Sequence, residues 1–151
     1  MALTVSLLTI RPAGTVTAPV QAMMDDYLRR CERAFAADCQ VYRTEEALLS
    51  AAVGKRKQGA ANLWIADLGG RTLTTDEFAE RVRQVRDGGL RHLMLAIGPA
   101  NGWSSAARAA AELRLSLGAM TLPHELAALV LAEQIYRVST ILQGHPYHLG
   151  H

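Results

Sequence analysis

The sequence is poor in the features that most directly reveal a protein's class. Its two cysteines, Cys31 and Cys39, fall in no metal-ligand spacing, and we expect buried free thiols rather than a disulfide. The longest unbroken apolar run is LAALVLA at residues 126–132, far below the roughly 20 residues that cross a bilayer. The first residues also lack the basic start and the long apolar stretch of an export signal. We therefore expect a cytoplasmic protein that does not enter a membrane.

An excess of charge of one sign is also missing. Sixteen Lys and Arg residues against fourteen Asp and Glu residues give a formal net charge of +2. Proteins that are held on nucleic acid by charge alone are far more basic, so any nucleic-acid contact must be local. Of the 151 residues, 50% are apolar, which is enough for one well-filled core. We expect a single domain over residues 1–151.

Short runs of Val, Ile and Leu alternate with longer segments of helical period, the pattern of a parallel sheet covered by helices on both faces. Strands are expected at residues 3–10, 39–43, 63–70, 92–97 and 116–120, and helices at 19–35, 44–59, 74–88, 103–115 and 123–142. Gly69 and Gly70 are expected to stop the third strand. Thr74 and Glu77 have the spacing of a capping box before the third helix. The predicted fold class is α/β, with about five parallel strands.

The last expected helix, residues 123–142, is apolar on nearly every side. Leu131, Ile135 and Val138 share one stripe, whereas Leu126 and Leu129 occupy other faces. Such a helix must be covered on more than one side, so we expect it to pack on its own sheet and against a second subunit of a homodimer. A central helix inside a monomer is the alternative.

Two segments have the position of a ligand-binding loop. IGPANG, residues 97–102, follows a strand and precedes a helix, where backbone amides line the crevice of an open parallel sheet; a plain turn is the alternative. In SLGAMTLPHELA, residues 116–127, a strand is expected to run through Gly118 into the last helix. The amides of this segment could hold an adenine-like edge, or the segment could be a tight capped connection. Asp67, at the end of the third strand, could face a ligand or cap a turn.

The chain ends in HPYHLGH, residues 145–151, which contains three of its five histidines. Their spacing is not that of a closed zinc site, and no cysteine or carboxylate stands nearby to complete four ligands, so we expect no metal. Pro146 and Tyr147 instead favour a stiff aromatic terminus that could stack on a base and donate to phosphate.

The motifs MTLPH, LAEQIYR and HPYH, in this order and spacing, resemble the C-terminal region of the ribosomal large subunit methyltransferase H family (RlmH), in the SPOUT class of methyltransferases. The resemblance is close from Arg91 to His148 and faint before that, where YLRR and IADLGG still align. It implies a SPOUT-like fold with a C-terminal trefoil knot, and a homodimer. It also implies methyl transfer from S-adenosylmethionine to N3 of a pseudouridine in large-subunit ribosomal RNA of the assembled ribosome.

The resemblance further implies roles for individual residues. The cofactor-binding residues would be Ala66, Asp67, Gly98, Leu117, Gly118, Ala119, Met120, Thr121 and Leu122. His148, Arg137 and Tyr147 would be catalytic, and Tyr136 and His145 would bind substrate. Because N3 of pseudouridine must lose its proton, a neutral imidazole or a guanidinium that stabilises the developing anion suits this reaction. The tail of one subunit would complete the site of the other.

Three departures from the family pattern support a second hypothesis. The family usually has a glycine, an arginine and a basic residue where this chain has Pro99, Ala128 and Leu149. Because RNA affinity depends on such cations, the alternative is a non-catalytic SPOUT-like homologue that keeps the knotted dimer and binds RNA or ribosomes.

Overall fold

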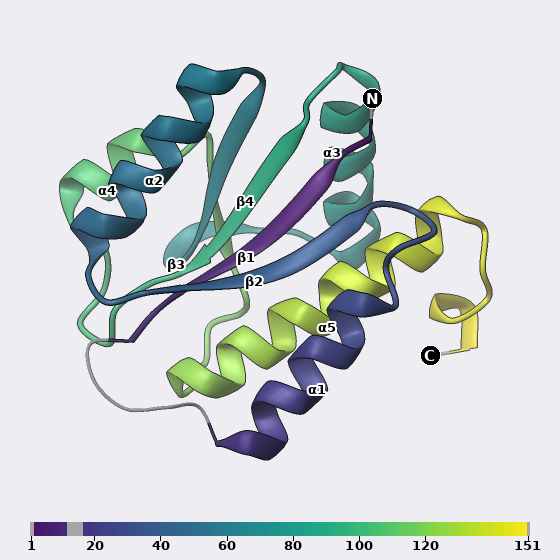
Figure 1. Ribbon diagram of the computed structural model, residues 1–151. Coiled ribbons are helices and arrows are strands. Elements are labelled where there is room, and N and C mark those ends of the chain that lie inside the picture. The colour runs from purple at the N-terminus through teal and green to yellow at the C-terminus, as the bar shows by residue number, and fades with distance from the viewer. Residues whose placement is uncertain (1, 12–16, 151) are drawn as a thin grey trace.

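A five-stranded sheet lies between two layers of helices in the computed structural model, which describes residues 2–11 and 17–150 (Figure 1). The strands are β1 (Thr4–Ile10), β2 (Ala36–Tyr42), β3 (Ala61–Thr72), β4 (His92–Ile97) and β5 (Leu113–Ser116). The helices are α1 (Ala18–Arg29), α2 (Glu45–Gln58), α3 (Thr75–Asp87), α4 (Ser105–Ala110) and α5 (His124–Leu142), followed by a short 3-10 helix, η1 (His148–Gly150). Neighbouring strands are parallel, in the order β2-β1-β4-β3-β5. The predicted α/β class with a parallel sheet is confirmed.

Helices cover both faces of the sheet, and because side chains alternate between the faces along each strand, the central strands contribute to a core on each side. In β1, Val5 and Leu7 belong to the core beneath α1, α3 and α5, whereas Leu8 and Ile10 belong to the core beneath α2 and α4. Figure 1 shows these two helical layers on opposite sides of the sheet. A strand that is buried on both faces is a nearly continuous apolar run, which explains the sequence of β1.

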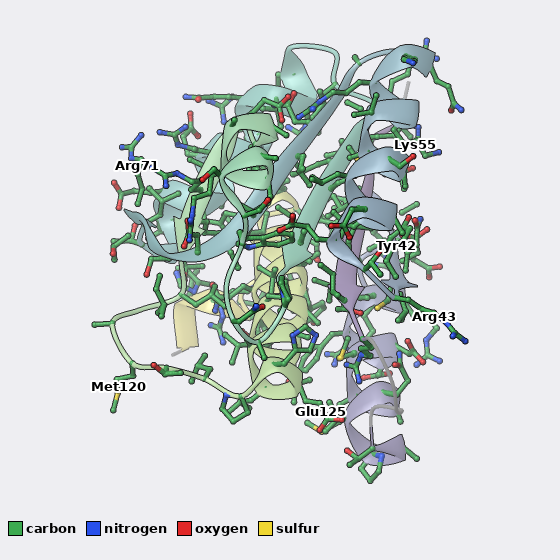
Figure 2. The ribbon with its side chains drawn as sticks, turned by 90° about the vertical axis from the view of Figure 1, so that its left-hand side faces the viewer. Tyr42, Arg43, Lys55, Arg71, Met120 and Glu125 are labelled. Atoms are coloured by element: carbon green, nitrogen blue, oxygen red, sulfur yellow. The ribbon has the colours of Figure 1, made fainter. Side chains whose placement is uncertain are left out.

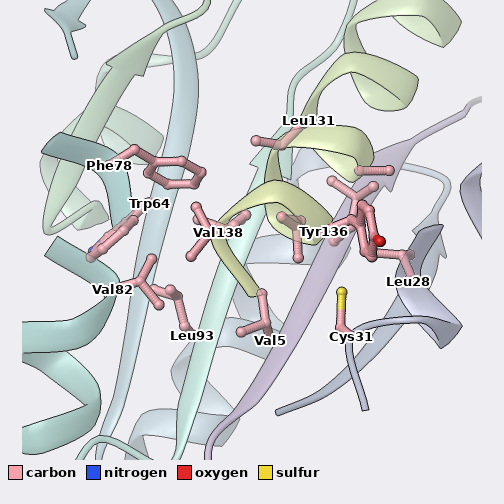
Figure 3. Packing of buried hydrophobic residues seen from close by; sticks show 14 of the residues in the cluster. Val5, Leu28, Cys31, Trp64, Phe78, Val82, Leu93, Leu131, Tyr136 and Val138 are labelled. Atoms are coloured by element: carbon pink, nitrogen blue, oxygen red, sulfur yellow. The ribbon is translucent and has the colours of Figure 1, made fainter. Parts of the chain in front are cut away.

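Helix α5 lies against the sheet with α1 and α3 packed beside it. Its Leu131 and Val138 point into the core near Trp64 and Phe78 (Figure 3). The two neighbouring helices cover sides of α5 for which the sequence suggested a second subunit. These contacts account for part of the apolar pattern of α5, but Leu126 remains 44% exposed, and the homodimer stays a prediction. No described helix is long and apolar enough to span a membrane.

Strand β3 does not stop at its glycines, so that prediction is wrong. The strand continues to Thr72 and pairs with β5 after an irregularity between Ala66 and Arg71. At Gly70 an added Cβ would come within 2.6 Å of the Arg114 carbonyl carbon. The glycine therefore allows two backbones to approach closely, which is the other role that glycine has inside strands.

The strand predicted at residues 116–120 lies earlier in the chain. In β5 the two leucines are buried and Arg114 is exposed, the alternation of a strand with one solvent-facing side. Residues 117–123 form an irregular loop instead, with Gly118 at a φ of 129°. The trefoil knot stays a prediction from the family resemblance.

Two helices are shorter than predicted. The alanine-rich segment favours a helix over residues 103–115, but α4 ends at Ala110, because the chain there begins to pair with β3. Helix α1 ends at Arg29 rather than at residue 35. The capping box at the start of α3 is confirmed. The two cysteines are free thiols, Cys31 buried and Cys39 partly exposed, and burial raises the pKa of both to about 11.

Candidate active site

A cavity of about 820 Å³ opens at the carboxyl end of β4, where β3 parts from β4 after Ala66. Its wall also includes the loop at residues 98–103, the loop at residues 117–123 and the first turn of α5. Ligands of open parallel sheets bind at this edge, and the volume lies in the range of sites for nucleoside-sized molecules. We therefore treat this cavity as the candidate ligand site.

Most of the residues predicted to bind a cofactor come together in this wall. Those that line the cavity are Ala66, Asp67, Gly98, Leu117, Gly118, Met120, Thr121 and Leu122. Ala119, the remaining member of the predicted set, is exposed and does not line the cavity. Met120 is 82% exposed and projects from its loop at the edge of the molecule (Figure 2).

Trp103 shapes the cavity, although the sequence reasoning did not single it out. Its indole is 5% exposed and donates a hydrogen bond of 2.7 Å from Nε1 to the carbonyl oxygen of Ala66. The ring also lies against Gly98, where an added Cβ would come within 2.5 Å of Cε2. Gly98 is therefore required by close packing against the tryptophan. The only sequence signal for this contact was a glycine five residues before a tryptophan, at the end of an expected strand.

The carboxylate of Asp67 is paired with two cations in the wall of the cavity. Its carboxylate is 9% exposed and lies 3.0 Å from Nε of Arg108 and 3.6 Å from Nη1 of Arg114. It also accepts a long hydrogen bond of 3.4 Å from the backbone N–H of Gly69, so the turn-capping alternative is realised as well. Both arginines line the cavity, and the sequence reasoning had not assigned either of them.

His124 contributes an unpartnered nitrogen to the same wall. It lines the cavity from the first turn of α5, and its Nε2 is buried with no hydrogen-bond partner among the described residues. Burial lowers the pKa of the imidazole, and Arg11 adds to this decrease, while the backbone of Gly98 opposes it. At neutral pH the ring is therefore uncharged and can hydrogen-bond a ligand. The sequence reasoning had assigned it a structural role.

The C-terminal tail forms a second cluster of candidate residues, built around Glu133 of α5. One Glu133 oxygen accepts from Nη2 of Arg137 at 2.6 Å and from the hydroxyl of Tyr147 at 3.1 Å. The Arg137 guanidinium stacks over the Tyr147 ring at 4.7 Å. Burial, followed by the hydrogen bond to Glu133, raises the pKa of Tyr147. The tail is thus held against its own helix.

The remaining predicted residues adjoin this cluster. His148 Nδ1 lies 3.3 Å from Nη1 of Arg137, and its Nε2 lies 3.3 Å from a carboxylate oxygen of Asp76. Arginine can only donate, so this geometry assigns the lone pair to Nδ1 and the proton to Nε2. Tyr136 is buried beside Tyr147, with ring centroids 4.8 Å apart. His145 is exposed and accepts from the Tyr147 backbone N–H at 3.2 Å.

The cavity and the tail cluster lie apart within one chain. The cavity reaches α5 at His124 and Ala127, whereas the tail packs at Glu133 and Arg137. At 1.5 Å per residue, Ala127 and Arg137 are separated by roughly 15 Å along the helix axis. Figure 1 shows the C-terminal segment beyond the far end of α5. The predicted cofactor and catalytic residues therefore do not form one site in a single chain.

The described part of the chain contains no group of three or more His, Cys, Asp or Glu side chains that could hold a metal ion. His151, the last histidine of the tail, lies outside the described residues.

Comparison with known proteins shows which class of enzymes this chain resembles. A family model described as "Predicted SPOUT methyltransferase" matches residues 7–148, so the chain is a member of the SPOUT methyltransferases. Two solved structures resemble the chain in fold. The SpoU methyltransferase AviRb from Streptomyces viridochromogenes, in complex with AdoMet, has a TM-score of 0.51 at 15% identity, over 91% of this chain and 58% of that one. A probable methylase family protein from Haemophilus influenzae Rd KW20 has a TM-score of 0.54 at 10% identity, over 95% of this chain and 69% of that one.

Relatives of similar sequence identify the family within this class of methyltransferases. The chain is 42% identical to the ribosomal RNA large subunit methyltransferase H of Koribacter versatilis (strain Ellin345), over 91% of this chain and 93% of the relative. It is 41% identical to the protein of the same name from Brucella abortus (strain S19), over 90% of this chain and 76% of the relative. The chain belongs to the ribosomal RNA large subunit methyltransferase H family.

Proposed function

We propose that this protein is an S-adenosylmethionine-dependent methyltransferase that acts on N3 of a pseudouridine in large-subunit ribosomal RNA. The observation that carries the proposal is the cavity at the carboxyl end of β4. Its wall gathers the residues to which the family resemblance gives a cofactor-binding role. The name of the relatives supplies the substrate class, ribosomal RNA of the large subunit.

The cavity fits the proposed cofactor chemically. The side chains of Ile97, Leu117 and Leu122 give apolar walls suited to an adenine ring, and the adjoining loops present backbone groups. The unpartnered Nε2 of His124 provides a hydrogen-bonding group inside the wall. Asp67 could hold ribose hydroxyls while it stays paired with its arginines. When bound, S-adenosylmethionine supplies an electrophilic methyl group.

The residues of this chain would remove the N3 proton and stabilise the negative charge that then develops on the base. His148 accepts from Arg137 at Nδ1 in the observed geometry, so its imidazole can accept the N3 proton once that hydrogen bond opens. Arg137 remains cationic and can stabilise the anionic base, and Tyr147 can stack on it. Tyr136 packs edge-on against the Tyr147 ring, and the exposed side chain of His145 can contact substrate.

The separation of cavity and tail favours a composite site in a homodimer. Since one chain cannot bring its tail residues to its own cavity as folded, a second chain would supply them. Apolar side chains beside the cavity offer a surface for this partner: Leu68 is 63% exposed, and Leu126 at the start of α5 is 44% exposed. By the family resemblance, the substrate would be the assembled ribosome and the reaction would take place in the cytoplasm.

Mixing two inactive variants tests the composite site. Gly98→Ala impairs the cavity and His148→Ala impairs the tail, so each should transfer poorly alone. After unfolding and joint refolding, mixed dimers should contain one intact site each, and activity should return to about a quarter of the wild-type value. Two tail variants refolded together serve as the control. Absence of recovery, with dimers present, would contradict a site shared between subunits.

A non-catalytic role in RNA or ribosome binding is the second candidate function. Pro99 lines the cavity, which makes it the departure closest to the proposed cofactor. Leu149 is 85% exposed in the tail, where a basic residue would reach solvent. Ala128 is fully buried, so the missing arginine removes no charge from the surface of the described chain. Calorimetric titration with S-adenosylmethionine and its demethylated product separates the two functions, since the non-catalytic role predicts no binding of either.

A further inference from the structure

A second cavity, of about 390 Å³, adjoins the first and is lined by four arginines. Arg71 comes from the end of β3, Arg81 from α3, Arg108 from α4 and Arg114 from β5. The sequence gives no sign of this group, since the four residues are not clustered along the chain. Guanidinium groups gathered in one cavity repel each other unless an anion is shared between them.

The backbone around Gly70 brings the arginines together. The irregularity in β3 lets residues 67–70 leave the ladder, and the strand then pairs with β5 again at Arg71 and Leu115. Gly70 permits this because only a residue without a Cβ fits against the Arg114 backbone. The register places Arg71 next to the strand that carries Arg114.

The nearby carboxylates leave two of the four arginines unpaired. Asp67 holds Arg108 and Arg114, whereas Arg71 and Arg81 form no ion pair or side-chain hydrogen bond with any described residue. Glu77 lies near both, but it is engaged with Thr74, whose backbone is the largest cause of its lowered pKa.

Glu112 also lines the cavity and is likewise engaged elsewhere. It pairs with Arg56 at 2.6 Å and accepts from the backbone N–H of Leu63 at 2.6 Å. Positive charge is therefore in excess here, in a protein that is nearly neutral overall.

We propose that this arginine cavity binds a phosphodiester group of the RNA strand beside the target nucleotide. The inference rests on the proposed function, in which the target base must reach the methyl group of S-adenosylmethionine held in the first cavity. Gly69, Arg108 and Arg114 line both cavities, so a strand whose base reaches the first cavity lies next to the second. Arginine binds phosphate through forked, charge-assisted hydrogen bonds. Such contacts fix the position of the strand without reading its sequence.

The test replaces the two unpaired arginines, Arg71→Gln with Arg81→Gln. Arg43→Gln is the matched control, because Arg43 is exposed, has no ion pair with a described residue and lies across the molecule from Arg71 (Figure 2). Two quantities are measured: affinity for a hairpin of large-subunit ribosomal RNA over a range of salt concentrations, and calorimetric affinity for S-adenosylmethionine. Methyl transfer to ribosomes that lack the modification is measured in parallel.

The double variant should bind the hairpin about tenfold more weakly, with a salt dependence shallower by about one unit of slope. Its KM for ribosomes should rise while kcat and S-adenosylmethionine affinity stay at wild-type values, as in the control. RNA affinity and slope equal to wild type would overturn the inference. So would a loss of S-adenosylmethionine affinity, which would assign the arginines to the cofactor, or competition by inorganic phosphate without any effect on RNA.

Failure of the proposed function gives a different result. If the wild-type protein transfers no methyl group to ribosomes, that function fails, and the salt dependence of hairpin binding still decides whether the arginine cavity holds RNA phosphate.

Discussion

Gly98→Ala should both destabilise the protein and weaken cofactor binding. The new Cβ would lie 2.5 Å from Cε2 and 2.7 Å from Nε1 of Trp103, far inside ordinary contact. The buried indole must then retreat by about 1 Å, in a core that has little free space. Its 2.7 Å hydrogen bond to Ala66 would lengthen beyond about 3.2 Å, the usual limit.

The expected cost follows from two contributions. Overpacking in a well-filled core costs about 1–3 kcal/mol, and a buried donor that loses its partner costs about 1–3 kcal/mol. Because the indole shift causes both, we expect a decrease of about 3 kcal/mol in the free energy of unfolding. Since Ala66, Gly98 and Trp103 all line the cavity, affinity for S-adenosylmethionine should fall as well.

Urea unfolding monitored by tryptophan fluorescence, together with calorimetric titration, measures both effects. Gly54→Ala in α2 is the control, because an added Cβ there meets nothing within 4 Å and a helical alanine should stabilise by about 0.5–1 kcal/mol. A Gly98→Ala protein with wild-type stability and wild-type cofactor affinity would refute the packing argument.

Three further predictions concern α3, the cavity histidine and the tail. Thr74→Ala removes a capping hydrogen bond of 3.1 Å and should lower the free energy of unfolding by about 1 kcal/mol in urea titrations. Because the folded pKa of Glu77 is depressed, the hydrogen bond that its carboxylate accepts from the Thr74 N–H should be complete above pH 4.5 and lost as pH falls through the folded pKa. The pKa of His124 in the folded protein lies below its ordinary 6.5, so its contribution to stability is complete above that pH and lost as pH falls through the folded pKa. His124→Gln should therefore make the free energy of unfolding fall less steeply with decreasing pH. An unchanged dependence of that free energy on pH would exclude His124 as the source of the decrease. Glu133→Gln should loosen the contacts to Arg137 and lower kcat while S-adenosylmethionine affinity is unchanged, whereas an unaltered kcat would remove Glu133 from the positioning of the tail.

The alternation of apolar runs and helical segments was enough to predict the parallel sheet, its covered faces and the capping box of α3. It misplaced β5, because the alanine-rich segment before it has strong helix propensity, and only pairing with β3 decides that Leu113–Ser116 is a strand. Gly69 and Gly70 were interpreted as a strand end, since the close approach of β5 that requires a glycine is a tertiary contact.

Local motifs identified most of the cavity wall, because the segments that follow parallel strands meet at one edge of the sheet. Trp103 was missed as a site residue because its hydrogen bond to Ala66 joins residues that are distant in sequence. His124 was missed because only the folded structure shows its Nε2 without a partner in the cavity wall. The arginine cavity was missed for the same reason, since its four members come from four elements. That the tail packs away from the cavity could not be read from spacing alone.

Methyl transfer to ribosomes that lack the modification is the most direct test of the proposed function. Purified protein is incubated with S-adenosylmethionine that carries a labelled methyl group, and the large-subunit RNA is then digested and analysed by mass spectrometry. We expect label on N3 of a single pseudouridine, none on ribosomes that already carry the methyl group, and a marked decrease with His148→Ala at unchanged cofactor affinity. Absence of label from wild-type reactions in which the protein binds ribosomes would contradict the proposed function and support the non-catalytic role.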